Sequence, residues 1–322
     1  MANANLTNAK RAKNDEFYTQ LTDIEKEMRH YKDFFKGKVV YCNCDDARES
    51  NFFKYFSLNF EHLGLKKLIT TGYKADGKGV VLVYEGDKNG NRIGEDSEIV
   101  TKELEGNGDF RSAECIEFLK ECDVVVTNPP FSLFREYVAQ LIEYGKKFLI
   151  IGNQNAITYK EIFPYIKNNE LWLGLSMNGS NRWFRAPDDY EVKENAAGYK
   201  VIDGKKYYFV NGVTWFTNIP HNKRNEELDL YRKYDADAYP KYDNYDAIEV
   251  SKVSEIPMDY EGVMGVPITF LYKYCPTQFE IVGITENADY LKSLYIPNQT
   301  KYDRPYINGK RIYSRLLIKI RA

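Results

Sequence analysis

The sequence predicts an α/β fold: a parallel sheet in the first part of the chain, then a smaller region of short antiparallel strands. Apolar runs of strand length at residues 39–41, 67–71, 123–127 and 148–152 alternate with helical-period segments at about 50–62, 111–120, 132–145 and 158–167. From about residue 170 onward the strands are short and aromatic-rich, and Gly-containing pairs at 203–204 and 308–309 suit hairpin turns. A chain of 322 residues, 43% of them hydrophobic, is long enough to bury a substantial core.

Local signals support the individual elements. Ser112 is placed to cap the helix at 111–120, and the helix at 132–145 follows a Pro-Pro pair that cannot itself be helical. Residues 77–96 interrupt the βα alternation and suit a hairpin around Asn89-Gly90, so we expect an excursion from the sheet. Residues 231–245 show little periodicity and suit a loop or connector. We place a boundary near 220, with a catalytic domain at 1–220 and a target-recognition region at 221–322.

Charge and composition narrow the possible partners. The net charge of -2 means that contacts to a polyanion must come from local patches, such as residues 301–322, which hold seven basic residues and one aspartate. A second basic cluster lies within residues 1–13, and either patch alone could be a solvated tail. The five cysteines and three histidines follow no zinc-binding spacing, so we expect no metal. The sequence shows no signal-peptide pattern and no apolar run of membrane-spanning length, so we expect a cytoplasmic protein with no membrane partner.

The strongest chemical signal is an apolar strand that runs directly into Asn128-Pro129-Pro130-Phe131. Ligand sites of open α/β sheets gather at the carboxyl ends of strands. The Asn128 amide oxygen and the Pro129 carbonyl are two acceptors for the hydrogens of a planar amino group, and the prolines fix the backbone that carries them. Phe131 offers a flat face to a base taken out of a duplex. The alternative is a tight turn with Phe131 as core filler.

Further motifs resemble those of the adenine-specific DNA methyltransferases of the EcoRI modification type. The resemblance covers nearly the whole chain and rests on ordered blocks at 14–20, 41–46, 108–112, 128–137, 148–153 and 262–270. It implies a Rossmann-like class I methyltransferase domain with a smaller DNA-recognition region. It also implies S-adenosylmethionine as methyl donor, S-adenosylhomocysteine as product, and a flipped adenine in double-stranded DNA as acceptor.

The resemblance assigns cofactor contacts to two blocks. Phe17 and Thr19 match the amino-terminal motif that closes over the methionine end of the cofactor, although the residues alone also suit the capped start of a helix at 24–31. Asp109 and Phe110 match the position that addresses the adenine ring of the cofactor. These two residues could at the same time form a turn before the helix that starts near Ser112.

One block departs from methyltransferases at large. Residues 42–46 replace the glycine-rich turn usual after the first strand, as they do in the EcoRI type. Asp45 and Asp46 could face the positively charged end of the donor, or could cap the following helix. No acidic residue clearly ends the strand at 68–73, so the contact to the cofactor ribose stays unassigned.

The substrate contacts are less specific. By resemblance, Trp215 or Phe216 packs a second ring on the flipped base, with a core role equally open. Arg304, Lys310, Arg311 and Arg315 are candidate phosphate contacts. The expected reaction is direct in-line methyl transfer to the N6 amino group of adenine. Cytosine C5 chemistry is disfavoured because Cys275, which precedes a proline, lies far from the strand-end motif.

Other functions fit parts of the pattern. Asn-Pro-Pro-aromatic also occurs in methyltransferases that modify glutamine side chains or RNA guanines, and a catalytically silent DNA-binding regulator or decoy could keep the fold. The aromatic and basic region that follows the motif argues against a protein substrate. We expect an enzyme that acts as a monomer on double-stranded DNA, and the sequence leaves open whether its setting is restriction-modification, phage defence or gene control.

Overall fold

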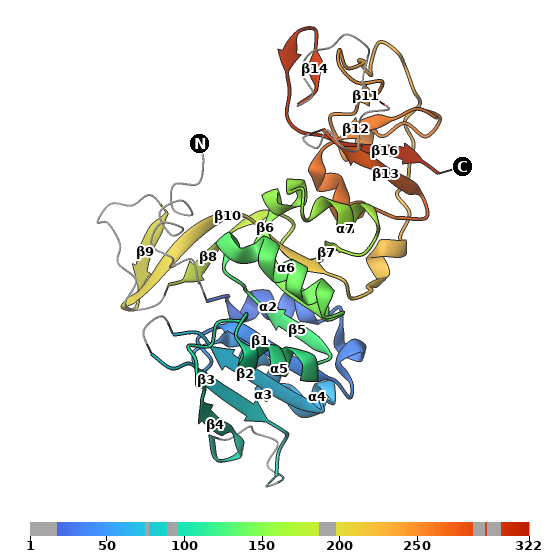
Figure 1. Ribbon diagram of the computed structural model, residues 1–322. Helices are drawn as coiled ribbons and strands as arrows, with labels where there is room; N and C mark the ends of the chain where they lie inside the picture. Colours follow the sequence, from blue (N-terminus) through green and yellow to red (C-terminus); the bar gives the residue numbers. More distant parts are fainter. Residues whose placement is uncertain are drawn as a thin grey trace. The chain divides into compact units, whose positions relative to one another are not determined.

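The computed structural model (Figure 1) describes residues 18–74, 77–88, 90, 96–186, 198–285, 294 and 304–321 of the 322. The chain divides into two compact units. The first contains residues up to 154 and residues 173–219, and the second contains residues 155–172 and those from 220 onward. The chain passes from the first unit to the second at 154–155, returns at 172–173 and leaves again at 219–220, so residues 155–172 belong with the second unit.

The first unit is built on one large mixed sheet of order β4-β3-β2-β1-β5-β6-β10-β7. The four middle strands are β2 (Lys67–Gly72), β1 (Val39–Asp45), β5 (Val124–Thr127) and β6 (Lys147–Asn153), and they run parallel. The long strand β10 (Lys205–Thr217) runs antiparallel to β6, and β7 (Trp172–Leu173) follows it. β8 (Ser180–Arg185) and β9 (Tyr199–Ile202) also pair with β10. The parallel strands predicted at 39–41, 67–71, 123–127 and 148–152 are therefore confirmed, and the fold is mixed α/β.

The described part of residues 77–96 contains strand β3, which belongs to the sheet. β3 (Val80–Tyr84) pairs antiparallel with β2, and β4 (Val100–Glu103) pairs antiparallel with β3, so this segment begins a hairpin that extends the sheet edge. The expected excursion from the sheet was wrong, because Leu82 and Tyr84 of β3 are buried in the main apolar cluster together with residues of the parallel strands.

Two sets of helices enclose the sheet. Alternate strand residues such as Val40 and Val126 pack with α2 (Leu21–Met28), α3 (Asn51–Leu58) and α4 (Phe60–Leu63) in one apolar cluster. Residues of the opposite parity contact α5 (Ala113–Glu121) and α6 (Phe134–Glu143), as the Tyr41–Phe118 ring pair illustrates. Ser112 caps α5 by accepting a hydrogen bond from the Cys115 amide, as predicted. None of the helices in the described ranges is long and apolar enough to cross a membrane.

The second unit contains a four-stranded sheet of order β11-β12-β16-β13. Its strands are β11 (Ile248–Glu249), β12 (Met264–Val266), β16 (Leu316–Ile320) and β13 (Phe279–Ile284), and a separate hairpin joins β14 (Tyr306–Ile307) to β15 (Lys310–Arg311). α7 (Phe163–Lys167) comes from the inserted segment and packs on β13, where the Lys167 Nζ donates to the Val282 carbonyl at 2.7 Å. Short 3-10 turns complete the chain at 32–35, 96–98, 131–133, 154–158, 222–225, 253–255 and 268–273.

Candidate active site

The Asn-Pro-Pro-Phe motif forms the loop between the carboxyl end of β5 and helix α6. Asn128 is 4% exposed and its side-chain oxygen is buried, and both prolines are buried. Phe131 is half-buried and Ser132 is exposed, so the loop passes from the interior to the surface within five residues. The Pro130 carbonyl accepts the Leu133 amide at 3.0 Å, which closes the turn into the helix. The motif therefore lies at a strand end and reaches solvent at its aromatic residue.

Asn43 ties this loop to the end of β1. The Thr127 hydroxyl donates to the Asn43 carbonyl, and the Tyr137 hydroxyl of α6 donates to the Asn43 side-chain oxygen. Asn43 is 3% exposed and Tyr137 is fully buried. Burial raises the pKa of Tyr137 well above its usual value, so this hydroxyl stays protonated and remains a donor. The ends of β1 and β5 and the first turns of α6 are thus held together by buried hydrogen bonds.

The turn after β1 has an unusual backbone. Cys44 adopts φ +71°, and the pairing of β1 with β2 shifts register between Cys42 and Asp45. The exposed Asp46 carboxylate accepts the Arg48 and Glu49 amides at 2.9 and 3.0 Å. Asp46 therefore caps this turn, whereas the following helix α3 is capped by Ser50, whose side chain accepts the Phe52 amide. The position of Asp46 at the surface leaves its carboxylate accessible. The Asp45 side chain lies outside the described part of the structure.

The amino-terminal segment meets the same turn. Phe17 lies outside the described residues, but Tyr18 forms an antiparallel bridge with Arg185 of β8. Thr19 is 1% exposed, its carbonyl accepts the Asn51 side-chain amide of α3 at 2.7 Å, and its buried hydroxyl makes no hydrogen bond within the described residues. A buried hydroxyl without a partner is costly unless another group satisfies it. Thr19 thus fits a polar ligand seated beside the β1–α3 turn.

The ion pair between Arg185 and Glu49 stabilises the same corner. The Arg185 guanidinium lies 2.8 Å from the Glu49 carboxylate and 5.5 Å from the centre of the Tyr18 ring. The hydrogen bond from Arg185 lowers the pKa of the Glu49 carboxyl, so Glu49 is ionised at neutral pH. The pair joins β8, the β1–α3 turn and the amino-terminal segment.

Asp109 and Phe110 lie in a loop at the carboxyl end of β2. Gly108 adopts φ +82°, and a Cβ at this position would lie 2.3 Å from the Gly72 carbonyl oxygen, so only glycine fits. The Arg111 guanidinium lies 2.6 Å from the Asp109 carboxylate and lowers the pKa of that carboxyl. Phe110 is 5% exposed, and its ring centre lies 5.0 Å from that of Tyr137. The loop therefore reaches the helix that carries the Asn43 contact.

Trp215 and Phe216 are both fully buried in β10. Trp215 packs edge-on against Phe52 of α3, with ring centres 6.2 Å apart, and Phe216 packs against Phe134 of α6 at 4.9 Å. A Cβ on Gly152 would lie 2.9 Å from the Phe216 ring, so the sheet itself makes room for that side chain. These positions favour the core role for both residues, the alternative left open from sequence.

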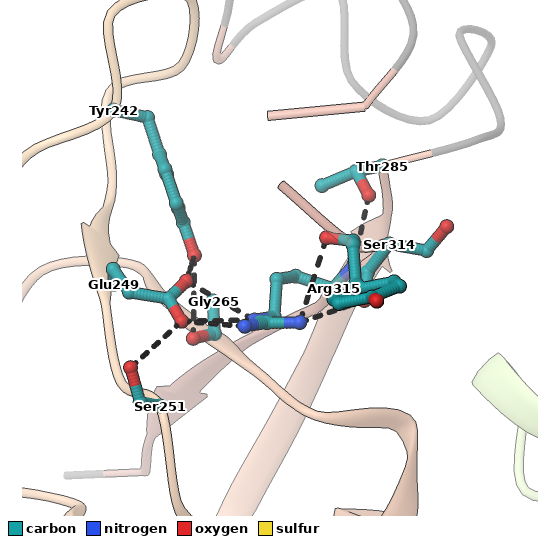
Figure 2. A network of polar contacts seen from close by, with 8 residues as sticks. Tyr242, Glu249, Ser251, Gly265, Thr285, Ser314 and Arg315 are labelled. Carbon is teal, nitrogen blue, oxygen red and sulfur yellow. Dashed lines mark hydrogen bonds and ion pairs between the residues drawn. The ribbon is translucent and has the colours of Figure 1, made fainter. Parts of the chain in front are cut away.

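Of the four candidate phosphate contacts, Lys310 and Arg311 are exposed on β15 and Arg304 is half-exposed. Arg315 is different. Its guanidinium forms a two-point ion pair with Glu249 at 2.6 and 3.1 Å, and the side chains are only 13% and 5% exposed (Figure 2). The structure therefore gives Arg315 a role inside the second unit, in place of an exposed contact to a polyanion.

The same network includes Tyr242, whose hydroxyl donates to Glu249 at 2.5 Å and lies close to Gly265 (Figure 2). A Cβ on Gly265 would lie 1.9 Å from that hydroxyl. Ser251 is a third residue that donates to the Glu249 carboxylate, at 3.2 Å. The buried carboxylate thus has several donors, as a charge in the interior requires.

Several residues that organise this site were not among those predicted. Asn43 and Tyr137 lie inside blocks that carried the family resemblance, but nothing in residue type or spacing indicated that their side chains would meet. Arg185 and Glu49 are far apart in sequence, and their pairing follows from the register of β8. Among the described residues there is no cluster of three or more His, Cys, Asp or Glu side chains that could hold a metal ion.

Comparison with known proteins identifies the family. The model of the adenine-specific methyltransferase EcoRI family matches residues 5–321. The type II methyltransferase M.EcoRI of Escherichia coli is 49% identical over 95% of this chain and 97% of its own length, and the type II methyltransferase M.MpnI of Mycoplasma pneumoniae is 41% identical over 97% of each chain. A solved structure from Pyrococcus horikoshii, described as an RNA methyltransferase, is 14% identical over 63% of this chain and 88% of its own, with a TM-score of 0.29. The chain therefore belongs to the family of EcoRI-type adenine-specific DNA methyltransferases.

Proposed function

We propose that the protein methylates the N6 amino group of an adenine extruded from double-stranded DNA, with S-adenosylmethionine as the methyl donor. The observation that carries this proposal is the position of Asn128–Phe131 at the carboxyl end of β5, joined through Asn43 to the turn after β1. Strand ends at the centre of an open sheet are where such folds bind their ligands.

In this proposal the Asn128 oxygen and the Pro129 carbonyl accept hydrogen bonds from the adenine amino group. The lone pair of that group is delocalised into the purine ring, and two acceptors in fixed positions favour a more nucleophilic nitrogen. The prolines keep these acceptors in place without adding a competing amide donor. Phe131, half-buried at the point where the loop reaches solvent, provides a ring face for the extruded base.

The residues that would hold the cofactor surround the ends of β1 and β2. Thr19 offers a buried hydroxyl with no partner among the described residues, Asp46 offers an exposed carboxylate, and the loop at Asp109-Phe110 offers a carboxylate and a ring. Bound S-adenosylmethionine would supply an electrophilic methyl on sulfur for direct in-line transfer to the adenine nitrogen. Phe17 and Asp45 are proposed contacts by family resemblance alone.

We further propose that the second unit reads the DNA target. Lys310 and Arg311 are exposed on β15, and Arg304 is half-exposed, so all three remain candidate phosphate contacts. The relatives M.EcoRI and M.MpnI are named as type II methyltransferases, which supports a role for this chain as the modification enzyme of a restriction-modification system. We propose that it acts as a monomer in the cytoplasm and needs no metal.

The test combines mapping of N6-methyladenine in DNA from cells that express the protein with assays of the purified enzyme. The wild type should methylate one short recurrent sequence, and Asn128→Ala should lose methyl transfer while it still binds S-adenosylhomocysteine in calorimetry. Near-normal turnover by Asn128→Ala would refute the role given to Asn128. Absence of N6-methyladenine with the wild type would refute the proposed activity.

A further inference from the structure

The long strand β10 continues past the edge of the sheet where the Asn128 loop lies. Its pairing with β6 covers Val213–Thr217, and Val213 is opposite Asn153, the last residue of β6. Residues 205–212 therefore run beyond the carboxyl ends of the parallel strands. β8 and β9 pair with this extension to form a three-stranded arm, made of 180–185, 199–202 and 205–210 (Figure 1).

One face of the arm is part of the core. Phe184 and Tyr208 are opposite each other across β8 and β10, and both are buried in the main apolar cluster. Tyr199, opposite Tyr208 across β9, packs against the same cluster. Because side chains alternate along a strand, the intervening residues must point to the other face.

That other face combines aromatic rings with cations. Trp183 is opposite Phe209, with ring centres 5.0 Å apart, and both are partly exposed. The Lys200 ammonium lies 4.0 Å from the centre of the Trp183 ring, and Lys200 pairs with the partly exposed Tyr207. Lys205, two residues before Tyr207 on the same face of β10, is exposed. We call Trp183, Lys200, Lys205, Tyr207 and Phe209 the outer face of the arm.

The composition of this surface indicates its partner. Of the residues of the outer face, Lys200 and Lys205 are basic and none is acidic. The connection at 187–197 lies outside the described part of the chain. Partly exposed rings beside cations suit a ligand with planar faces and negative charge, which is the chemistry of a nucleic-acid strand. Trp215 and Phe216 cannot serve in this way because both are fully buried.

We propose that the outer face of the arm binds the DNA strand next to the adenine to be methylated. The rings of Trp183, Tyr207 and Phe209 pack on sugar and base faces exposed by extrusion, and Lys200 and Lys205 neutralise phosphates. This inference rests on the proposed function, because it places the DNA at the edge of the sheet where the Asn128 loop ends. It assigns a DNA contact to the first unit, in addition to the contacts proposed for Lys310 and Arg311 on the β14–β15 hairpin of the second unit.

The test measures binding of the full-length protein to a fluorescein-labelled DNA duplex that contains the mapped methylation site. Affinity is recorded by anisotropy at several salt concentrations, with S-adenosylhomocysteine present. The double variant Lys200→Gln, Lys205→Gln should reduce the slope of log affinity against log salt by about two, as expected for the loss of two phosphate contacts. Trp183→Leu should raise the Kd for DNA roughly 5- to 150-fold, the range for loss of one base-stacking ring.

The matched control is Lys102→Gln, which removes an exposed lysine from β4 at the far edge of the same sheet. The lysine variants should bind S-adenosylhomocysteine and unfold on heating as the wild type does. Their DNA binding therefore tests the proposal even if Trp183→Leu folds poorly. A salt slope and an affinity equal to those of Lys102→Gln would overturn the proposal for the arm. If the wild type methylates DNA, that outcome rejects the arm alone and leaves the proposed function standing.

Discussion

Tyr137→Phe tests whether the buried link between β1 and α6 stabilises the catalytic unit. The substitution removes only the hydroxyl that donates to the Asn43 side-chain oxygen. Tyr137 is fully buried and Asn43 is 3% exposed, so water cannot replace the lost donor. A buried acceptor left without a partner costs about 1–3 kcal/mol, and we expect unfolding free energy to fall by this amount.

The assay is urea denaturation of the full-length protein, monitored by tryptophan fluorescence, with the midpoint and slope of the transition compared at constant pH. Trp183, Trp172 and Trp215 provide the signal. Tyr144→Phe is the matched control, because Tyr144 is only half-buried and follows the same helix; a change within about 0.5 kcal/mol is expected there. The affinity for S-adenosylhomocysteine should also weaken for Tyr137→Phe, because Asn43 precedes the turn proposed to hold the cofactor. A Tyr137→Phe protein as stable as Tyr144→Phe would refute the reasoning.

Two further predictions concern charges. Asp109→Asn should lower the free energy of unfolding at pH 7, because Arg111 lowers the pKa of the Asp109 carboxyl in the folded protein. The ionised carboxylate therefore stabilises the fold at pH values above its unfolded-state pKa of about 3.9. This contribution is lost as the pH falls through the folded-state pKa. The difference between the urea midpoints of wild type and variant should therefore stay constant above about pH 5 and narrow as the pH falls below about 3.9. A difference that stays the same down to pH 3 would contradict the prediction. Arg315→Met should lower the free energy of unfolding by about 3–5 kcal/mol, because it leaves the Glu249 charge buried without its partner. Adding Glu249→Gln should restore most of that loss. If the Arg315→Met protein unfolds at the same urea concentration as the wild type, the prediction is wrong.

The parallel strands could be predicted because each depends on a local pattern. A continuous apolar run such as 124–126 is typical of a strand covered on both faces, and the structure buries all of it. The Ser112 cap and the Asn-Pro-Pro-Phe loop were predictable for the same reason, since short-range chemistry determines them. The family assignment followed from several such blocks in order, and the comparisons confirm it.

What could not be predicted depends on contacts between distant segments. Trp215 is an amphipathic ring that suits a core or a binding surface, and only the register of β10 against β6 decides that it faces Phe52. Arg315 belongs to a basic stretch, but its role depends on Glu249, 66 residues earlier. The hairpin at β3–β4 extends the sheet because its apolar face completes the core, which no local turn signal reveals.

The two-part construction of the second unit limits how the protein can be dissected. Residues 155–172 are separated in sequence from the rest of their unit, yet α7 packs on β13 and Lys167 bonds to Val282. A truncation after residue 219 would leave this helix with an uncovered apolar side, contributed by Phe163 and Ile166. Such a fragment would be prone to aggregate, and separating the two units cleanly would need a shortened bridge from 154 to 173 as well as a stop at 219.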